Sequence, residues 1–456
     1  MKKNFIIIIM LFMAMIAKSQ VPNTLTREDK VFGLSKIWQE VNYNFIYLER
    51  IDRVKWDSTY RAMIKTVQET ENDYEYYREL QKFCALLKDG HTNIKMPNEK
   101  GFEIMTSMFG DYRIFIQNID GKAIIVRTNL SKKDEIPAGT EVIEVNGIAT
   151  AEYIQKEVAP YISSSTEHVL QDFSISRLLW GLKGEKYHIT IKKTNGTTAT
   201  LKLKHAQTIE EDVYPPLEKE KGLLEFKWFE NKIAYLSLNE FNSPEIGTLF
   251  TNLLPELYTA KALIIDLRFN PGGRTDIGRE IFQYLTNDSV IYGAKSSSRL
   301  HIPVFKAWGQ FIKISDTLNN ERAKQSLLSF QDQYYYNFDY SPYRLIPDSK
   351  RIVVPTAILT GHFTASAAED FLIYADNQKH MTKIGEKTYG STGQPMSFDL
   401  PGGGKARICT KKDTYADGRE FVGFGIKPDI EVKPTLNDFI QNNDPVLNRA
   451  ISYLKQ

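Results

Sequence analysis

Several features that often reveal a protein's chemistry are missing from this chain of 456 residues. It has only two cysteines, no Cys–His spacing typical of a zinc site, and no His-Glu-x-x-His motif. The sequence therefore predicts no metal and no cofactor. Cys84 and Cys409 lie far apart, and the sequence leaves open whether they pair or are both simply buried.

An excess of charge of one sign is also absent. The formal net charge is +2, which gives no drive toward nucleic acid or toward an anionic membrane surface. Aromatic residues make up 12% of the chain, which favours a globular protein over a disordered one.

No apolar run is long enough for a comfortable membrane span. The run Phe5 to Ala17 follows Lys2 and Lys3 and ends at small residues, which is typical of a signal peptide. We expect residues 1–20 to be removed and the protein to be exported, periplasmic or extracellular, without stable membrane insertion. A retained N-terminal anchor is the alternative, and no cysteine marks a lipoprotein junction.

The rest of the chain is too long for one ordinary core, so two or three domains are expected. Residues 21–98 show helical spacing of apolar residues, and residues 99–215 contain short β-like runs separated by Asn-Gly turns. Residues 216–456 alternate strands and helices, which predicts an α/β core. The segment at about 300–350 is an aromatic-rich insertion. The sequence leaves three roles open for it: lining a substrate groove, forming a lid, or a purely structural role.

Two segments place a turn between a buried strand and a helix. The segment Thr364–Glu369 follows the apolar run 353–359 and precedes a helical pattern. Ser366, flanked by alanines, is accessible there, and the free N–H groups of the helix start can hold negative charge. A helix cap is the alternative role for such a serine.

The second turn contains paired glycines. Gly272 and Gly273 follow the strand-like run 261–268, and a helical pattern begins near Asp276. Glycines let backbone N–H groups approach a ligand, although Asn-Pro-Gly-Gly is also ordinary turn chemistry. A phosphate-binding loop is disfavoured because no Gly-Lys-Ser/Thr follows.

Together these motifs are similar to those of a known family. Asp-Leu-Arg-x-Asn-Pro-Gly-Gly, Thr-Ala-Ser-Ala-Ala-Glu and the Gly-Ile-Lys-Pro-Asp-Ile stretch at 425–430 resemble the serine peptidase family of C-terminal processing proteases and the tricorn core. The resemblance spans about residues 25 to 455. It implies a multidomain α+β protein with an N-terminal helical bundle, a PDZ-like β module and an α/β, crotonase-like ββα, protease core.

The resemblance also assigns roles within the two turns. It implies that Ser366 is the nucleophile and that an oxyanion hole is built from backbone N–H groups of Gly272 or Gly273 and of Ala367. The implied partner is a peptide or protein substrate.

A serine nucleophile needs a base, and the family uses either a lysine or a histidine. Ser391 stands where the processing proteases have lysine, whereas Asp89-Gly90-His91-Thr92 resembles the histidine motif of the tricorn branch. We therefore expect His91 to be the base and its ring to lie near Ser366. His362, Lys387 and Lys383 are the competing candidates.

The third catalytic position is less well matched. Glu420 is the carboxylate nearest to the expected place, which Val422 occupies, and Gly90 replaces the serine that precedes the tricorn histidine. The resulting prediction is an exported serine endopeptidase with Ser366, His91 and Glu420 as its catalytic residues. The alternatives are a non-catalytic peptide-binding protein on the same fold and a hydrolase of a non-peptide ester or amide.

Overall fold

The structure is a computed structural model that describes residues 24–97, 102–345 and 350–455. The predicted signal peptide lies outside these ranges. Within them, no helix is both long and apolar enough to cross a membrane.

The N-terminal part is a layer of three helices, α1 (Arg27–Asn44), α2 (Arg53–Glu69) and α3 (Asp73–Ala85). Thr26 begins α1 with a capping box, because its hydroxyl accepts from Asp29 N and the Asp29 carboxylate accepts from Thr26 N. Trp56 and Phe83 stack with ring centroids 4.0 Å apart between α2 and α3. A short 3₁₀ turn, η1 (Leu48–Arg50), joins α1 to α2.

A β module follows, with its own hydrophobic core. Its main sheet has the order β10-β4-β5-β8-β9, with β3 on β4 and β6 on β5. The strands are β3 (Ile114–Ile119), β4 (Lys122–Asn129), β5 (Thr140–Val145), β6 (Ile148–Ala149), β8 (Lys186–Lys192), β9 (Thr198–Lys204) and β10 (Val213–Tyr214). Asn146 and Gly147 form the turn between β5 and β6 with positive φ at both residues, as an Asn-Gly turn requires.

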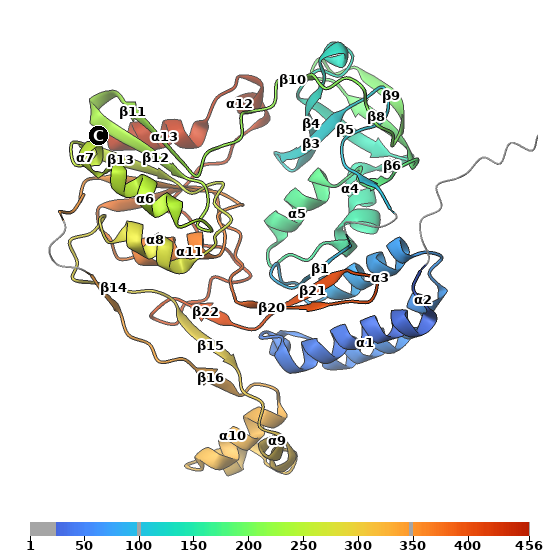
Figure 1. Cartoon of the computed structure of the whole chain (residues 1–456), viewed down its shortest axis with the longest axis vertical. Helices are drawn as coiled ribbons and strands as arrows, with labels where there is room; N and C mark the ends of the chain where they lie inside the picture. The colour runs from blue at the N-terminus through green and yellow to red at the C-terminus, as the bar shows by residue number, and fades with distance from the viewer. Residues whose placement is uncertain (1–23, 98–101, 346–349, 456) are drawn as a thin grey trace, which may run out of the picture.

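Helical segments complete this module. They are η2 (Leu130–Lys132), α4 (Thr150–Tyr153), the π-helical turn η3 (Ile154–Val158), η4 (Ala159–Tyr161) and α5 (Glu167–Ser176). A two-stranded ribbon, β2 (Ile104–Met105) with β7 (Gly181–Leu182), lies beside them. The helix α5 packs against β3 and lies on the side of the module that faces the third part of the chain (Figure 1), which it contacts through His168 and Asp172.

The third part is built on a six-stranded sheet of order β11-β12-β13-β18-β19-β23, parallel except for β11. Its strands are β11 (Leu224–Phe229), β12 (Ile233–Leu238), β13 (Ala262–Asp266), β18 (Thr356–Thr360), β19 (Met381–Gly385) and β23 (Ile430–Glu431). Every residue of β12, β13 and β18 is buried, which explains why their sequences are mostly apolar.

Helices cover both faces of this sheet. One face packs against α6 (Glu245–Asn252), α8 (Thr275–Phe282) and α11 (Ala367–Ala375), with α7 (Leu254–Leu257) beside them. The other face packs against α13 (Pro445–Leu454), and η5 (Glu230–Lys232) and α12 (Leu436–Ile440) lie in its connections. The chain thus has the mixed helix-and-sheet architecture expected of the α/β core.

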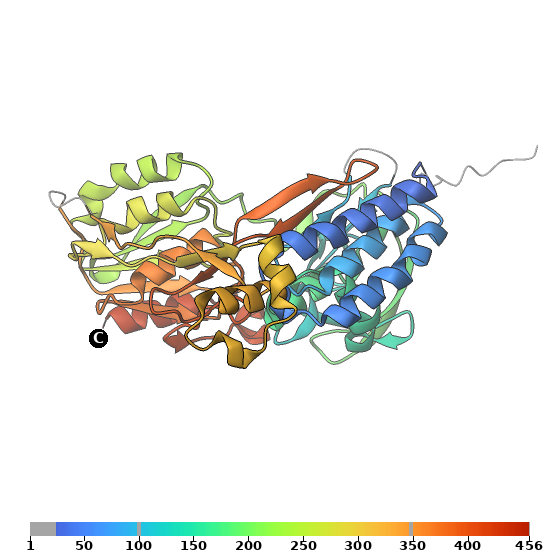
Figure 2. The same ribbon diagram turned by 90° about the horizontal axis from the view of Figure 1, so that it is seen from below.

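A strand hairpin joins the core to the helical layer. The strands β20 (Pro395–Asp399) and β21 (Lys405–Cys409) form a sheet with β1 (Asn93–Lys95), in the order β1-β21-β20. Figures 1 and 2 show this hairpin lying along the N-terminal helices. It brings the segment just before β1, which contains His91, next to the core.

The insertion projects away from the rest of the molecule (Figure 1). Its helices are α9 (Pro303–Gly309), η6 (Ile314–Thr317) and α10 (Glu321–Phe330). Its base is formed by two small sheets, which contain β14 (Val290–Ile291), β15 (Lys295–Arg299), β16 (Tyr335–Asn337), β17 (Tyr343–Arg344) and β22 (Lys412–Thr414). No residue of 300–345 lines either cavity described below.

The two cysteines do not pair. Cys84 and Cys409 are both buried free thiols, and burial raises the pKa of Cys84 to about 12. The disulfide left open by the sequence is therefore absent, and the thiols serve as small core residues.

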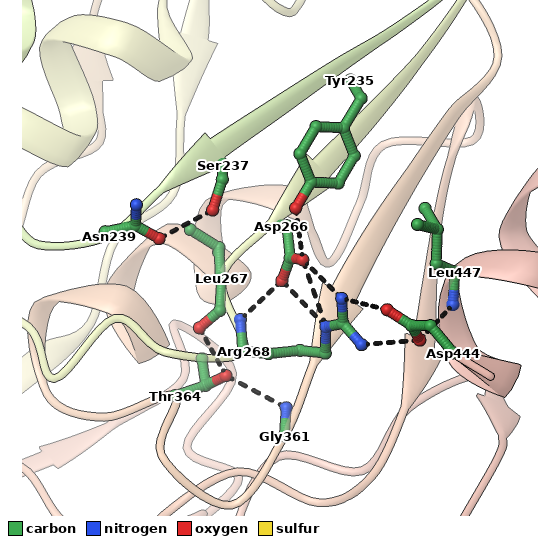
Figure 3. A network of polar contacts seen from close by, with 10 residues as sticks. All are labelled: Tyr235, Ser237, Asn239, Asp266, Leu267, Arg268, Gly361, Thr364, Asp444 and Leu447. Atoms are coloured by element: carbon green, nitrogen blue, oxygen red, sulfur yellow. Dashed lines mark hydrogen bonds and ion pairs between the residues drawn. The ribbon is translucent and has the colours of Figure 1, made fainter. Parts of the chain in front are cut away.

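A charged network ties the core sheet to the C-terminal helix (Figure 3). The guanidinium of Arg268 bonds to Asp266, whose carboxylate also accepts from Tyr235 Oη at 2.8 Å. The same guanidinium binds both oxygens of Asp444 at 2.9 Å, and Asp444 caps the start of α13. These residues hold the loop after β13 in place.

Breaking this network is expected to destabilise the fold. Arg268→Gln leaves Asp266, whose side chain is 2% exposed, without its cation, so we expect a loss of about 3 kcal/mol in the free energy of unfolding. Urea denaturation measures this loss. Arg274→Gln, which removes an exposed ion pair with Asp276, is the control and is expected to have little effect. Equal stability of the two variants would contradict the assignment.

Candidate active site

Ser366 lies on a sharp turn between β18 and α11. Its backbone has φ 55° and ψ −121°, a region that residues other than glycine rarely adopt. Such strain costs about 1–3 kcal/mol and persists only where the surroundings enforce it. Turns of this kind between a strand and a helix are used to display nucleophilic side chains.

A buried carboxylate holds this turn. Glu369, in the first turn of α11, accepts hydrogen bonds from the backbone N–H of Ser366 at 3.1 Å and of Gly390 at 2.8 Å. It also accepts from Ser391 N at 3.3 Å and from the Thr388 hydroxyl. One carboxylate thus joins the Ser366 turn to the 388–391 loop.

Burial sets the protonation of this carboxylate. Glu369 is fully buried, and burial raises its pKa to about 8 even though its four hydrogen bonds act in the opposite direction. Glu369 was not among the site residues predicted from the sequence. The Ser-x-x-Glu spacing of a capping box was the signal that could have identified it.

His91 contacts the same loop. Its Nδ1 lies 2.6 Å from Ser391 Oγ, and the structure gives its Nε2 no hydrogen bond within the described residues. Burial is the largest cause that lowers the pKa of His91, while Asp89 acts in the opposite direction. The ring is therefore neutral at pH 7, the state in which a base accepts a proton.

The structure shows no direct polar contact between His91 and Ser366 in the ranges it describes, so their expected pairing stays a prediction. Among the described residues no hydrogen bond joins their side chains. Instead, His91 binds the Ser391 hydroxyl, and Ser391 N and Ser366 N bind the same Glu369 oxygen. The structure thus brings together two segments that lie far apart in the sequence.

The competing bases point elsewhere. His362 Nδ1 bonds to Asp172 of α5 at 2.6 Å, and although burial lowers its pKa, this carboxylate raises it above the ordinary value. Lys383 pairs with Asp429 at 3.4 Å. Neither Lys383 nor Lys387 has a hydrogen bond to Ser366 in the part of the chain that the structure describes.

Glu420 is engaged on the protein surface. Its carboxylate pairs with Lys412 at 2.5 Å and with Arg50 at 3.4 Å, and the Lys412 hydrogen bond lowers its pKa. No contact within the described ranges joins Glu420 to His91. The group that does hold the His91 ring is the hydroxyl of Ser391.

The glycine turn packs directly on the Ser366 turn. A Cβ built on Gly272 would lie 2.7 Å from Ser366 Cβ and 2.9 Å from Ala367 N, so only glycine fits there. Gly272 N donates to Asn270 Oδ1 at 2.9 Å, which occupies that N–H. For Gly273 and Ala367 the structure gives no acceptor within the described residues, so both N–H groups are available to a ligand.

Two cavities lie near these residues. A cavity of about 1140 Å³ is lined by residues of α5 and of the core, both acidic and basic, including Asp172, His362 and Glu386. A second cavity, of about 520 Å³, is lined by Gly90 and Tyr389 and lies next to His91 and Ser391 in the chain. The described residues contain no cluster of three or more His, Cys, Asp or Glu placed to bind a metal.

The protonation of Glu369 should affect stability. Since its folded-state pKa lies above the ordinary 4.5, the folded protein retains a proton that the unfolded chain loses. The contribution of Glu369 to stability is therefore largest below pH 4.5 and falls as the pH rises toward about 8. In Glu369→Gln the side-chain amide faces backbone donors, which destabilises the variant by about 1–3 kcal/mol for each donor left unpaired.

The test compares the free energies of unfolding of the wild type and Glu369→Gln by urea denaturation from pH 5 to pH 8. We expect the difference between them to shrink as the pH rises. A constant difference would show that Glu369 does not titrate in this range.

Comparisons with known proteins agree with this architecture. Residues 232–432 match the model of peptidase family S41. The chain is 23% identical over 410 residues to the carboxyl-terminal-processing protease of Picosynechococcus sp., covering 88% of this chain and 82% of that protein. It is 21% identical over 417 residues to the carboxy-terminal processing protease CtpA of Bacillus subtilis, covering 91% and 71%.

A solved structure shows a similar fold. Mature CPAF superimposes with a TM-score of 0.64 at 14% identity, covering 94% of this chain and 96% of that chain. The family resemblance inferred from the motifs is confirmed: residues 232–432 form a peptidase family S41 domain, and the protein is a serine-type peptidase.

Proposed function

We propose that the protein is an exported serine endopeptidase in which Ser366 is the nucleophile and His91 is the base. The observation that carries this proposal is the shared attachment of Ser366 and His91 to the 388–391 loop, through Glu369 and Ser391. The strained turn at Ser366 supports the nucleophile, and the unoccupied Nε2 of a neutral imidazole supports the base.

In this proposal Ser366 Oγ attacks the carbonyl carbon of a peptide bond while His91 Nε2 takes the hydroxyl proton. The N–H groups of Gly273 and Ala367 stabilise the oxyanion of the tetrahedral intermediate. His91 returns the proton to the leaving amine as the C–N bond breaks, leaving an acyl group on Ser366. A water molecule, deprotonated by His91, then attacks the acyl carbon, and the C–O bond to Ser366 breaks as His91 returns the proton to Ser366 Oγ. Gly272 supplies the close packing of the turn, since its own N–H is bonded to Asn270.

Ser391 orients the base in this scheme. When His91 Nδ1–H donates to Ser391 Oγ, the tautomer that leaves Nε2 as the acceptor is selected. This is the position at which a lysine would stand in the other branch of the family. Glu420 stays a prediction as the third catalytic residue, and its ion pairs with Lys412 and Arg50 would have to break first.

The β module at 99–215 is proposed to be PDZ-like and to bind an extended peptide along a sheet edge. Its sheet ends at β10 on one side and β9 on the other. Deletion of the module should raise KM for long peptides more than for short ones, and equal effects would argue against this role.

Export is proposed from the charged start, apolar run and small residues within 1–20. We expect mass spectrometry of the protein recovered outside the cytoplasm to find an N-terminus near Ser19 or Gln20. An intact Met1 in that material would contradict the proposal.

Ser366→Ala should lower peptide hydrolysis by at least about 1000-fold, because the nucleophile is lost. Thermal unfolding should change little, because the serine contributes at most about 1 kcal/mol as a helix cap. A serine-reactive phosphonate should label the wild type at Ser366 only. Unlabelled wild-type protein would favour the non-catalytic alternative, and labelling with hydrolysis of esters but not peptides would favour the second alternative.

His91→Ala should reduce kcat by orders of magnitude. Because burial holds the pKa of His91 below 6.5, kcat/KM of the wild type should stay level at neutral pH and fall only as the pH drops below 6.5. Ser391→Ala should move this acid limb and lower kcat with little change in KM. Lys387→Ala is the control, since Lys387 is exposed. Loss of activity in Lys387→Ala with retention in His91→Ala would return the assignment to a serine–lysine pair.

A further inference from the structure

The cavity of about 520 Å³ beside Gly90 has charge of only one sign. The charged residues that line it are Lys95, Arg177, Lys405 and Arg407, and the other lining residues are uncharged. The larger cavity differs, because carboxylates and cations both line it. The smaller cavity therefore favours an anionic ligand.

Three of these cations share one face of the β1-β21-β20 sheet. Lys95 lies directly opposite Lys405, and Arg407 lies two residues along the same strand. The opposite face carries Ile94 and Ala406, which are buried in the main core. Like charges directly opposite each other destabilise a strand pair, so this arrangement has a cost that the fold itself does not require.

The fourth cation comes from a different element. Arg177 is the C-cap residue of α5, where the helix dipole favours a positive charge. Its guanidinium stacks on Phe173 and Trp180, with 4.8 and 5.1 Å to the ring centroids. Burial lowers its pKa. Stacking fixes the planar guanidinium in place, which prepares it for a bidentate contact with a carboxylate.

Three of these four cations have no carboxylate partner in the part of the chain that the structure describes. Lys405 pairs with Asp399 at 3.7 Å, and both side chains are more than half exposed. Within residues 24–97, 102–345 and 350–455, Lys95, Arg177 and Arg407 make no ion pair with a carboxylate. Arg177 is partly buried, and a guanidinium in that setting without a counter-ion is unfavourable unless a ligand supplies one, whereas Arg407 and Lys95 are exposed and meet the ligand from the solvent side.

The cavity adjoins the proposed catalytic base. Gly90 directly precedes His91, and a Cβ built on Gly90 would lie 3.3 Å from Ser391 Oγ and 2.7 Å from the Tyr389 ring. Tyr389 N donates to Thr364 O, two residues before Ser366. A group bound in the cavity would thus lie close to the bond that is cut.

We infer that this cavity binds a carboxylate of the peptide substrate, with Arg177 and Arg407 as its principal contacts. This inference rests on the proposed function, because it places the carboxylate relative to Ser366 and His91. The carboxylate comes either from an Asp or Glu side chain near the cleaved bond or from the C-terminus of the peptide, and both sources present the same two oxygens to the guanidinium groups.

The test measures binding in the uncleaving Ser366→Ala protein, so that it does not depend on turnover. Fluorescent peptides of one sequence carry a single Glu at successive positions, each with a Gln counterpart, and each is made with a free or an amidated C-terminus. We expect at least about tenfold tighter binding when the decisive carboxylate is present, as charge-assisted hydrogen bonds predict. Dependence on Glu identifies a side chain, and dependence on the free terminus identifies the chain end.

The variants then locate the contact. Arg177→Gln and Arg407→Gln, each in the Ser366→Ala background, should remove the preference for the carboxylate. Arg322→Gln should retain it, because Arg322 also stacks on a tryptophan, Trp308, but lies in the insertion. Thermal unfolding checks that each variant is folded. Lys95→Gln tests the same cavity at a lining residue whose side chain is exposed.

Equal affinity for carboxylate and amide peptides would overturn the inference, and so would a preference that survives in the Arg177→Gln, Arg407→Gln double variant. Selective binding without cleavage by the wild type would leave the cavity assignment standing and count against the catalytic proposal. Cleavage without any carboxylate preference would support the catalytic proposal and count against the cavity assignment.

Discussion

The buried carboxylate of Glu369 is the contact on which the rest of the site depends. It accepts hydrogen bonds from Ser366 and from the 388–391 loop, so it fixes the strained turn and the support of His91 together. Strained backbone persists only when its surroundings leave no alternative, and a carboxylate with four donors provides such surroundings. The cost of burying it is reflected in its raised pKa.

His91, the proposed base, follows the N-terminal helices, whereas Ser366 belongs to the α/β core. The geometry of the site therefore depends on how these two parts of the chain pack together. Ser391 has a short side chain, and the imidazole of His91 reaches it from the segment between α3 and β1. The strand β1 pairs with β21, with Asn93 opposite Arg407. Because Asn93 is only two residues after His91, this pairing also fixes the position of the His91 segment. Strand pairing between distant parts of the chain therefore positions the ring, and a one-residue slip in register would displace it.

The sequence predicted much of the core but only part of the site. The runs that became β13 and β18 are mostly apolar because parallel strands are buried on both faces, and glycines or small residues marked both turns. The β20–β21 hairpin and its partner β1 could not be paired in advance, because periodicity carries no information about a partner some 300 residues away. For the same reason the contact of His91 with Ser391, and the engagement of Glu420 by Lys412 and Arg50, became visible only in the structure.

Electrostatics connects the cationic cavity to the base. Burial is the main reason that the pKa of His91 is low, and the positive charge of Arg407 acts in the same direction. A carboxylate bound at Arg407 would offset that charge and raise the proton affinity of His91. A neutral ligand in the same place would leave it unchanged. The cation is Arg407, which the β1–β21 register places opposite Asn93, close to His91 in the chain. The charge of the ligand bound at Arg407 thus affects the basicity of His91.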